Sequence, residues 1–216
     1  MTAKKGNHSS TDLWKIEMIH DKWLDVKNRQ MWIHGVPTDP QYDDEEPGVE
    51  HNMSTKVIKN LHILKSMGKT PVTIHLHTCG GDCTEGMAIY DAIKMMPYKT
   101  RIISYTHARS MSSIILQAGD YRYLLPHSYF MFHEGTSATW GTVKSVNSWV
   151  EFSKIWDQFM MDIYARRLQK KGKFRGKSQE KIKVILRSYM DRKEDVYLTA
   201  EEAVKWGFAD KVLRSF

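Results

Sequence analysis

Apolar residues follow strand-like and helix-like spacings in turn along most of this 216-residue chain. Three β-rich runs predict strands, and each is followed by a segment in which apolar residues recur every three or four positions, as in a helix with one buried face. The predicted strands cover 29–35, 71–77 and 99–105, and the predicted helices that follow them cover 54–67, 84–96 and 112–118. Repeated strand–helix units predict an α/β domain with helices packed on a sheet.

The C-terminal half contains one helical pattern much longer than the others. Apolar side chains from Val146 to Tyr164 keep helical spacing within a predicted helix over 142–169, which we expect to project as an arm. The other elements predicted here are short strands over 121–125, 129–132 and 210–213, a polar turn over 107–111, an acidic turn over 191–195, and helices over 178–190 and 199–207.

The N-terminal segment carries its own helical pattern, over 10–28. We therefore divide the chain into an N-terminal segment, 1–30, and one main domain, 31–216, with the arm as a handle over about 134–177. Between Pro37 and Pro47 lie five carboxylates, and the segment Pro37 to His51 is predicted to be a mobile acidic loop.

Composition and charge exclude several classes of protein. A hydrophobic content of 41% with 7 Trp predicts a folded core, and the apolar runs are far shorter than the roughly 18 residues that a membrane span needs. Seven basic residues between Arg166 and Lys177 equal the net charge of +7, but Gly172 and Gly176 favour a solvated helix end and loop over a nucleic-acid site. We expect neither a membrane nor a nucleic-acid partner.

The cysteines and the N-terminus favour a cytoplasmic protein. Only Cys79 and Cys83 are present, so no disulfide framework can hold the fold. The first thirty residues include charged side chains among their apolar positions and lack the continuous apolar stretch of a secretion signal.

Ser110 lies where a predicted strand turns into a predicted helix, which is the position that exposes a nucleophilic serine. The backbone N–H of Met111 would be unpaired at the start of that helix. A second donor to an oxyanion is expected from Gly80-Gly81 at the neighbouring turn, because glycine permits close approach. A serine at a helix start is by itself more often a simple N-cap, so this local pattern leaves both alternatives open.

Several motifs, taken in order and spacing, make the chain from about Met31 to Leu213 resemble the ClpP family, the proteolytic subunits of the Clp protease. The motifs are Gly80-Gly81 with Thr84 to Asp91, Ala108 to Met111, Leu125 to Ser128, Met131 to His133, and Tyr197 to Val204 with Gly207 and Asp210. The resemblance implies a ClpP/crotonase-like α/β fold of repeated βα units with a projecting long helix.

The resemblance also implies the site. Ser110 occupies the nucleophile position, His133 that of the general base and Asp195 that of the orienting acid, with Asp191 as the alternative third member. Gly81 and Met111 occupy the positions whose N–H groups form the oxyanion hole. His133 would take the proton of Ser110 during attack on a peptide carbonyl, and water would release the acyl-enzyme.

The implied activity is that of a serine endopeptidase that cleaves unfolded polypeptides inside a chamber. Two rings of seven copies, or of copies mixed with paralogues, would stack through the long helix and a strand near Thr136 to Trp140, beside which peptides bind. No cofactor is implied, since ATP is used only by a partner AAA+ unfoldase. Two alternatives are a non-catalytic structural subunit of a mixed ring and a phage-type maturation protease.

The chain departs from the family pattern beside the site and at the docking positions for the unfoldase. Cys79 stands in place of a proline, Ser112 in place of a glycine and Arg109 in place of a small residue, so Arg109 could narrow the pocket or favour acidic substrates. Family aromatic residues that form the docking pocket are replaced by Thr73, His75 and Met95. The segments 37–51 and 170–177 resemble insertions.

A zinc site is a further alternative. His75, His77, Cys79 and Cys83 lie within nine residues, and alternation would place both histidines on one face of a strand. A four-ligand metal would crowd the Gly80-Gly81 turn, so we expect no metal and assign these residues polar or core roles.

Overall fold

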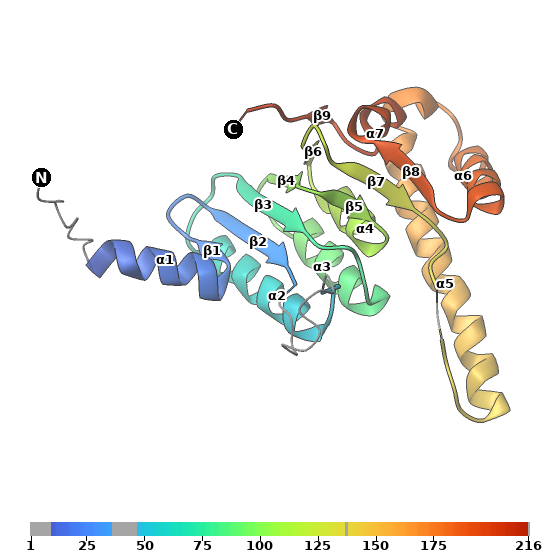
Figure 1. Ribbon diagram of the computed structural model, residues 1–216, viewed down its shortest axis with the longest axis horizontal. Coiled ribbons are helices and arrows are strands. Elements are labelled where there is room, and N and C mark those ends of the chain that lie inside the picture. Colours follow the sequence, from blue (N-terminus) through green and yellow to red (C-terminus); the bar gives the residue numbers. More distant parts are fainter. Residues whose placement is uncertain (1–9, 36–46, 137, 216) are drawn as a thin grey trace, which may run out of the picture.

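The computed structural model describes residues 10–35, 47–136 and 138–215. Within these ranges, six strands form one sheet in the order β1-β2-β3-β4-β6-β9, with β1 antiparallel to β2 and every later neighbour parallel (Figure 1). The strands of this sheet are β1 (Leu24–Asp25), β2 (Gln30–His34), β3 (Val72–His77), β4 (Thr100–Ser104), β6 (Tyr121–Leu124) and β9 (Lys211–Val212).

A second, smaller sheet lies beside the first. Its described strands follow the order β5-β7-β8, with β5 parallel and β8 antiparallel to β7. They are β5 (His107–Arg109), β7 (Tyr129–Phe132) and β8 (Val196–Thr199).

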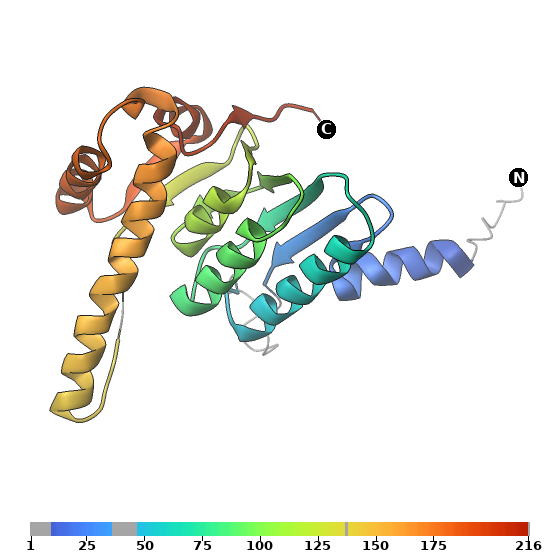
Figure 2. The same cartoon turned by 180° about the vertical axis from the view of Figure 1, so that it is seen from behind.

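Helices cover one face of the larger sheet, as seen from behind in Figure 2. Parallel strands need such crossovers, because each must return to the same end of the sheet. The helices on this face are α2 (His51–Ser66), α3 (Cys83–Lys94) and α4 (Met111–Ala118). The other described helices are α1 (Ser10–Lys22), α5 (Val143–Leu168), α6 (Gln179–Lys193) and α7 (Ala200–Trp206), with a short 3-10 helix, η2 (Gly172–Phe174). The predicted α/β fold with repeated strand–helix units and a long helix is confirmed.

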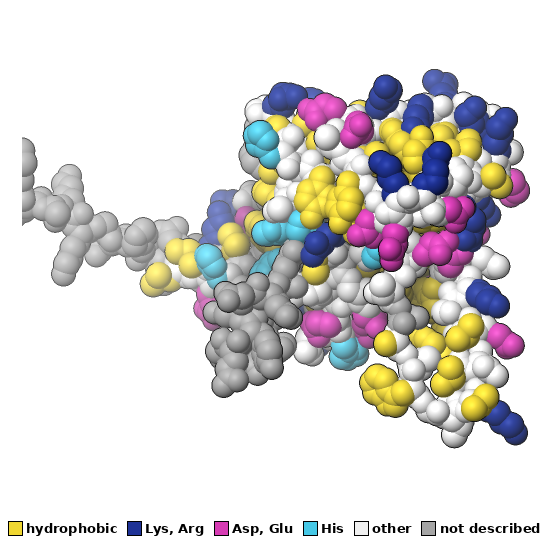
Figure 3. All heavy atoms as spheres, turned by 45° about the vertical axis from the view of Figure 1, so that its right-hand side comes forward, with side chains coloured by type: hydrophobic (Ala, Val, Ile, Leu, Met, Phe, Trp, Pro, Cys, Tyr) yellow, Lys and Arg dark blue, Asp and Glu magenta, His cyan; other side chains and the backbone are white. Residues whose placement is uncertain are grey.

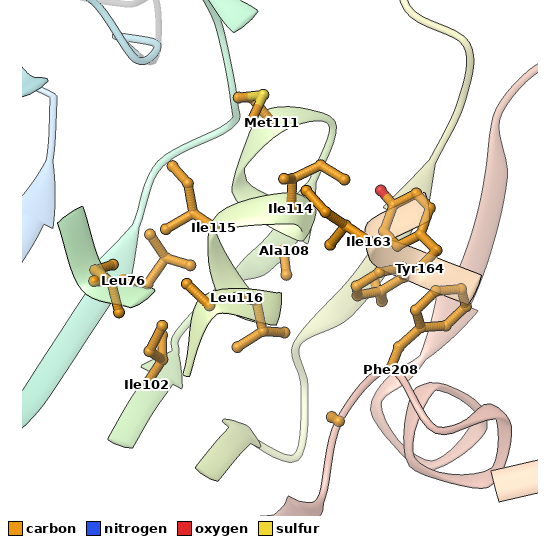
Figure 4. Packing of buried hydrophobic residues seen from close by; sticks show 14 of the residues in the cluster. Leu76, Ile102, Ala108, Met111, Ile114, Ile115, Leu116, Ile163, Tyr164 and Phe208 are labelled. Carbon is orange, nitrogen blue, oxygen red and sulfur yellow. The ribbon is translucent and has the colours of Figure 1, made fainter. Parts of the chain in front are cut away.

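The core is continuous and has α4 at its centre. Every residue of α4 is buried, and its side chains lie between Leu76 and Ile102 of the sheet on one side and Ile163 and Tyr164 of α5 on the other (Figure 4). Its polar side chains, Ser112, Ser113 and Gln117, are buried with the apolar ones and form hydrogen bonds inside the domain. The start of α4, where Ser110 lies, is thus fixed by packing on both sides.

The arm is helix α5, which extends well beyond the rest of the domain (Figure 1). Only its C-terminal part is buried, through Met161, Ile163, Tyr164, Ala165 and Leu168. The expected strand over 136–140 is wrong at its described residues, which lack regular structure, and residue 137 lies outside the described ranges. A strand needs a partner for its backbone groups, and no described segment of the chain pairs with residues 136 and 138–140.

Several element boundaries differ from prediction. Helix α2 begins at His51 rather than at residue 54, because the carboxylate of Glu50 accepts hydrogen bonds from the N–H groups of Asn52 and Met53 and caps the helix. The C-terminal end of the predicted acidic loop is therefore not a loop, since Val49 forms a β-bridge with Gly81 and His51 begins α2. Residues 36–46 of that loop lie outside the described residues. Helix α6 continues to Lys193, so the acidic turn is shorter than expected.

Three short strands were not predicted: β1, β5 and β8. The predicted polar turn over 107–111 is wrong over His107–Arg109, which pairs with β7. β1 lies inside the predicted N-terminal helix and β5 inside the predicted turn, while β8 lies between a predicted turn and a predicted helix. Pairing with neighbouring strands fixes these short segments instead.

Candidate active site

Ser110 occupies a sharp backbone turn between β5 and α4. Its φ of 50° and ψ of −129° lie in a region that favours glycine. The backbone N–H of Ser110 bonds the carbonyl of Met131 at 3.2 Å, and its carbonyl accepts the N–H of Ser113 at 3.0 Å. The turn is therefore held by the small sheet on one side and by the first turn of α4 on the other.

Three side chains distant in sequence meet at this turn. The Nε2 atom of His133 lies 2.9 Å from Oγ of Ser110, and its Nδ1 atom lies 3.0 Å from Oδ1 of Asp195. A carboxylate only accepts hydrogen bonds, so Nδ1 carries the proton and Nε2 is the acceptor for the Ser110 hydroxyl. The side chains of His133 and Asp195 are 19% and 40% exposed, so the series is open to a substrate.

The small sheet explains why these residues converge. Phe132 of β7 pairs with Val196 of β8, so the next antiparallel pair along the ladder is His133 and Asp195. Ser110 directly follows β5, which runs beside β7. The alternative third member, Asp191, lies on the exposed side of α6, where its charge acts on Arg187.

The turn that contains Gly80 and Gly81 lies directly against Ser110. A Cβ atom on Gly80 would lie 2.8 Å from Cβ of Ser110 and 2.9 Å from N of Met111, so only glycine permits this approach. The carbonyl of Gly80 accepts the N–H of Val49 at 2.5 Å, and the N–H of Asp82 bonds the carbonyl of Val49 at 2.9 Å. Because C=O and N–H point in opposite directions across a trans peptide, the N–H of Gly81 points away from Val49.

Met111 is the other residue expected from the sequence to donate to an oxyanion. It is the first residue of α4, and the first N–H groups of a helix have no acceptor within that helix. Its side chain is buried against Gly86 of α3, where a Cβ atom would collide with it. The N–H groups of Gly81 and Met111 thus come from two turns in direct contact, close to the hydroxyl of Ser110.

Sequence patterns missed two groups that support the three-residue series. The hydroxyl of Tyr197 donates to Oδ2 of Asp195 at 3.2 Å, on the side of the carboxylate away from His133. Arg187 of α6 bonds Glu134, the residue after His133, at 3.2 Å and also contacts Asp157 of α5. Tyr197 is exposed on β8 between the buried residues Val196 and Leu198.

The polar residues near the site that suggested zinc are engaged elsewhere. His75 bonds the hydroxyl of Tyr105 at 2.7 Å and Oε1 of Gln30 at 2.8 Å through its two ring nitrogens, and burial lowers its pKa. Nε2 of His77 lies 3.0 Å from the hydroxyl of Thr106. Within the described ranges, no group of three or more His, Cys, Asp or Glu side chains is placed to hold a metal ion.

Arg109, on β5, is half-buried and stands beside Met131 of β7. Its positive charge acts to lower the pKa of Tyr197, although burial and the charge of Asp195 outweigh it and raise that pKa. Across the part of the chain that the structure describes, no helix combines the length and apolarity needed to cross a membrane.

Comparison with known proteins agrees with this architecture. The sequence model of the family described as Clp protease matches residues 46–216. The chain is 28% identical over 170 residues to ATP-dependent Clp protease proteolytic subunit 2 of Pseudomonas aeruginosa, covering 78% of each chain. It is 30% identical over 169 residues to the ATP-dependent Clp protease proteolytic subunit of Deinococcus radiodurans, covering 76% of each. The resemblance predicted from the motifs is confirmed: this chain belongs to the Clp protease family.

Proposed function

We propose that this chain is a serine endopeptidase that cleaves unfolded polypeptides inside an oligomeric chamber. The observation that carries the proposal is the contact series from Oγ of Ser110 through the ring of His133 to the carboxylate of Asp195. A hydroxyl, an imidazole and a carboxylate in series are the parts that nucleophilic acyl transfer requires.

The geometry supports the following course of reaction. His133 accepts the proton of Ser110 as Oγ attacks a peptide carbonyl, and Asp195 stabilises the imidazolium that forms. The N–H groups of Gly81 and Met111 stabilise the negative charge on the carbonyl oxygen. His133 then protonates the leaving amine, and a water molecule activated in the same way hydrolyses the acyl-enzyme. These steps use only side chains and backbone groups of this chain and require no cofactor.

The test is covalent labelling with a fluorophosphonate probe, combined with a fluorogenic peptide assay of the purified chain. We expect labelling of the wild type and its loss in Ser110→Ala, with a fall in peptide hydrolysis of about 10⁴-fold or more. Equal labelling of both proteins would refute Ser110 as the nucleophile. A chain that assembles but neither reacts with the probe nor cleaves peptides would instead be the non-catalytic subunit of a mixed ring.

The arm supports assembly into two stacked heptameric rings. Apolar side chains remain exposed along α5 and the segment before it, as Figure 3 shows on the projecting arm. They are Trp140, Val143, Trp149, Val150, Phe152, Ile155 and Phe159. Burying a fully exposed side chain of this kind is worth about 1.5–3 kcal/mol, and side chains that are 39–90% exposed gain a corresponding part of it, which favours contact with the arm of a second copy.

Native mass spectrometry tests the assembly. We expect fourteen subunits for the wild type and seven for a variant with Trp149→Glu and Phe159→Glu, because charges on both side chains oppose burial between rings. The same spectra, recorded after probe labelling, count the reactive subunits per particle. A wild-type particle that keeps fourteen subunits despite both substitutions would contradict stacking through α5.

The partner that feeds the chamber is proposed to be an ATP-dependent AAA+ unfoldase in the cytoplasm. A cavity of about 520 Å³ opens on the strands of the larger sheet, and Thr73 and His75 lie in its wall. Lys99, Arg101 and Lys211 also line it. Tyr121 and Tyr123 line it as well, so the wall combines basic and aromatic side chains. The basic side chains, together with Thr73 and His75, support docking of an unfoldase other than the one that binds an aromatic pocket.

A further inference from the structure

Ser112 forms a buried hydrogen bond between the two turns that flank the nucleophile. Its hydroxyl donates to the backbone carbonyl of Thr78 at 2.5 Å, and both residues are completely buried. Thr78 follows the end of β3, and Ser112 is the second residue of α4. The bond therefore joins segments that are 34 residues apart in the chain.

Each end of this bond lies next to a proposed oxyanion donor. Thr78 begins the turn that leads to Gly81, and Ser112 directly follows Met111. The two turns already touch, since Gly80 approaches Ser110 and Met111 too closely to carry a side chain. The hydroxyl of Ser112 therefore ties together two backbone segments whose N–H groups must point at the same oxygen.

Donor spacing matters more for the transition state than for substrate binding. Oxyanion donors act on the charge that develops during attack, and loss of one donor costs about 10²–10³ in kcat. A catalytic group must be held to within about 0.5 Å of its productive position. We propose that the Ser112–Thr78 hydrogen bond fixes the distance between the Gly81 and Met111 donors, so that Ser112 is a positioning residue for the oxyanion site. This inference rests on the proposed peptidase function.

The test compares Ser112→Ala with Ser104→Ala. Ser104 is also completely buried, and its hydroxyl donates to the carbonyl of His107 at 2.7 Å, so the control loses a bond of the same kind away from the donor turns. Each protein is titrated with the fluorophosphonate probe to count competent sites. The values of kcat and KM, the pH profile of kcat/KM, and inhibition by a peptide boronic acid, which forms a tetrahedral adduct, are then measured per titrated site.

For Ser112→Ala we expect kcat to fall about tenfold and the boronic acid inhibition constant to rise about tenfold, because loosened donors stabilise both tetrahedral species less well. KM should stay within twofold, and the pH profile should keep its midpoints, because the Ser110–His133–Asp195 series is unaltered. For Ser104→Ala we expect all of these quantities to stay within twofold of wild type.

Ser112→Cys provides a second variant in case alanine prevents folding. A thiol is similar in shape but is a weak donor, so an intermediate loss in kcat is expected. Wild-type values of kcat and inhibition in both Ser112 variants would overturn the positioning role while leaving Ser110 as the nucleophile. A shifted pH profile would also overturn it, since the defect would then lie in the His133 series. Absence of Ser110-dependent labelling in the wild type would overturn the proposed function and this inference with it.

Discussion

Nη2 of Arg122 lies 2.9 Å from Oδ1 of Asp210 in an ion pair that joins β6 to the segment before β9. The Arg122 side chain is only 4% exposed, and its Nη1 atom also bonds the carbonyls of Gly207 and Phe208. One guanidinium therefore attaches the C-terminal segment to the larger sheet.

Asp210→Asn is expected to lower the free energy of unfolding by about 3–5 kcal/mol, because it leaves the buried charge of Arg122 without its counter-ion. Urea titration followed by tryptophan fluorescence measures this change. The matched control is Glu201→Gln, which breaks the exposed pair with Arg214 and should cost less than about 1 kcal/mol. Similar losses of unfolding free energy in the two variants would contradict the prediction that the buried ion pair contributes more than the exposed one.

The same pair predicts a dependence of stability on pH. Burial alone would raise the pKa of Asp210, but hydrogen bonds and charge from Arg122, together with Lys171, outweigh burial and lower the pKa overall. A folded-state pKa below the unfolded value of about 3.9 means that the contribution is present above about pH 4 and is lost as pH falls through the folded pKa. In urea titrations, the stability difference between wild type and Asp210→Asn should therefore stay constant from pH 6 to about pH 4 and shrink as the pH falls further, and a difference that stays constant below pH 4 would refute this assignment.

Tyr197→Phe is expected to lower kcat/KM about threefold. The variant removes the hydroxyl that bonds Oδ2 of Asp195, while its ring keeps its contact with Tyr129. In an Asp195→Ala background the same change should have no effect, because its acceptor is gone. Peptide hydrolysis rates of the four proteins complete the cycle, and equal losses in both backgrounds would show that Tyr197 acts through something other than Asp195.

Ser110→Gly should be more stable than Ser110→Ala by about 1 kcal/mol. The φ of 50° and ψ of −129° at this position cost a residue with a side chain about 1–3 kcal/mol, whereas glycine loses somewhat more backbone entropy on folding. Both variants lack the hydroxyl, so chemistry does not affect the comparison. Denaturation midpoints measure it, and a less stable glycine variant would mean that the turn is relaxed.

Local patterns predicted the large elements well, because α3 and α5 carry apolar residues at helical spacing over several turns. The start of α2 was wrong because Glu50, a residue seldom found as a cap, takes that role. Strands β5 and β8 carry too few residues to be recognised. They are also the strands that bring Ser110 and Asp195 to His133, so periodicity alone could not assemble the site.

The resemblance to a family predicted those site residues instead, because the motifs occur in the family's order along the chain. The motifs do not reveal how the strands of the small sheet pair. The motifs did not indicate the bond from Ser112 to Thr78 or the one from Tyr197 to Asp195, since both depend on three-dimensional contacts.

The backbone turn at Ser110 has a consequence for the evolution of such subunits. Chemistry demands a hydroxyl at a position where the fold alone would prefer a glycine. As long as a lineage is selected for hydrolysis, the serine persists against that preference. In a copy that has only a structural role within a ring, substitution of this serine by glycine becomes favourable. A glycine at this position would therefore identify a non-catalytic subunit.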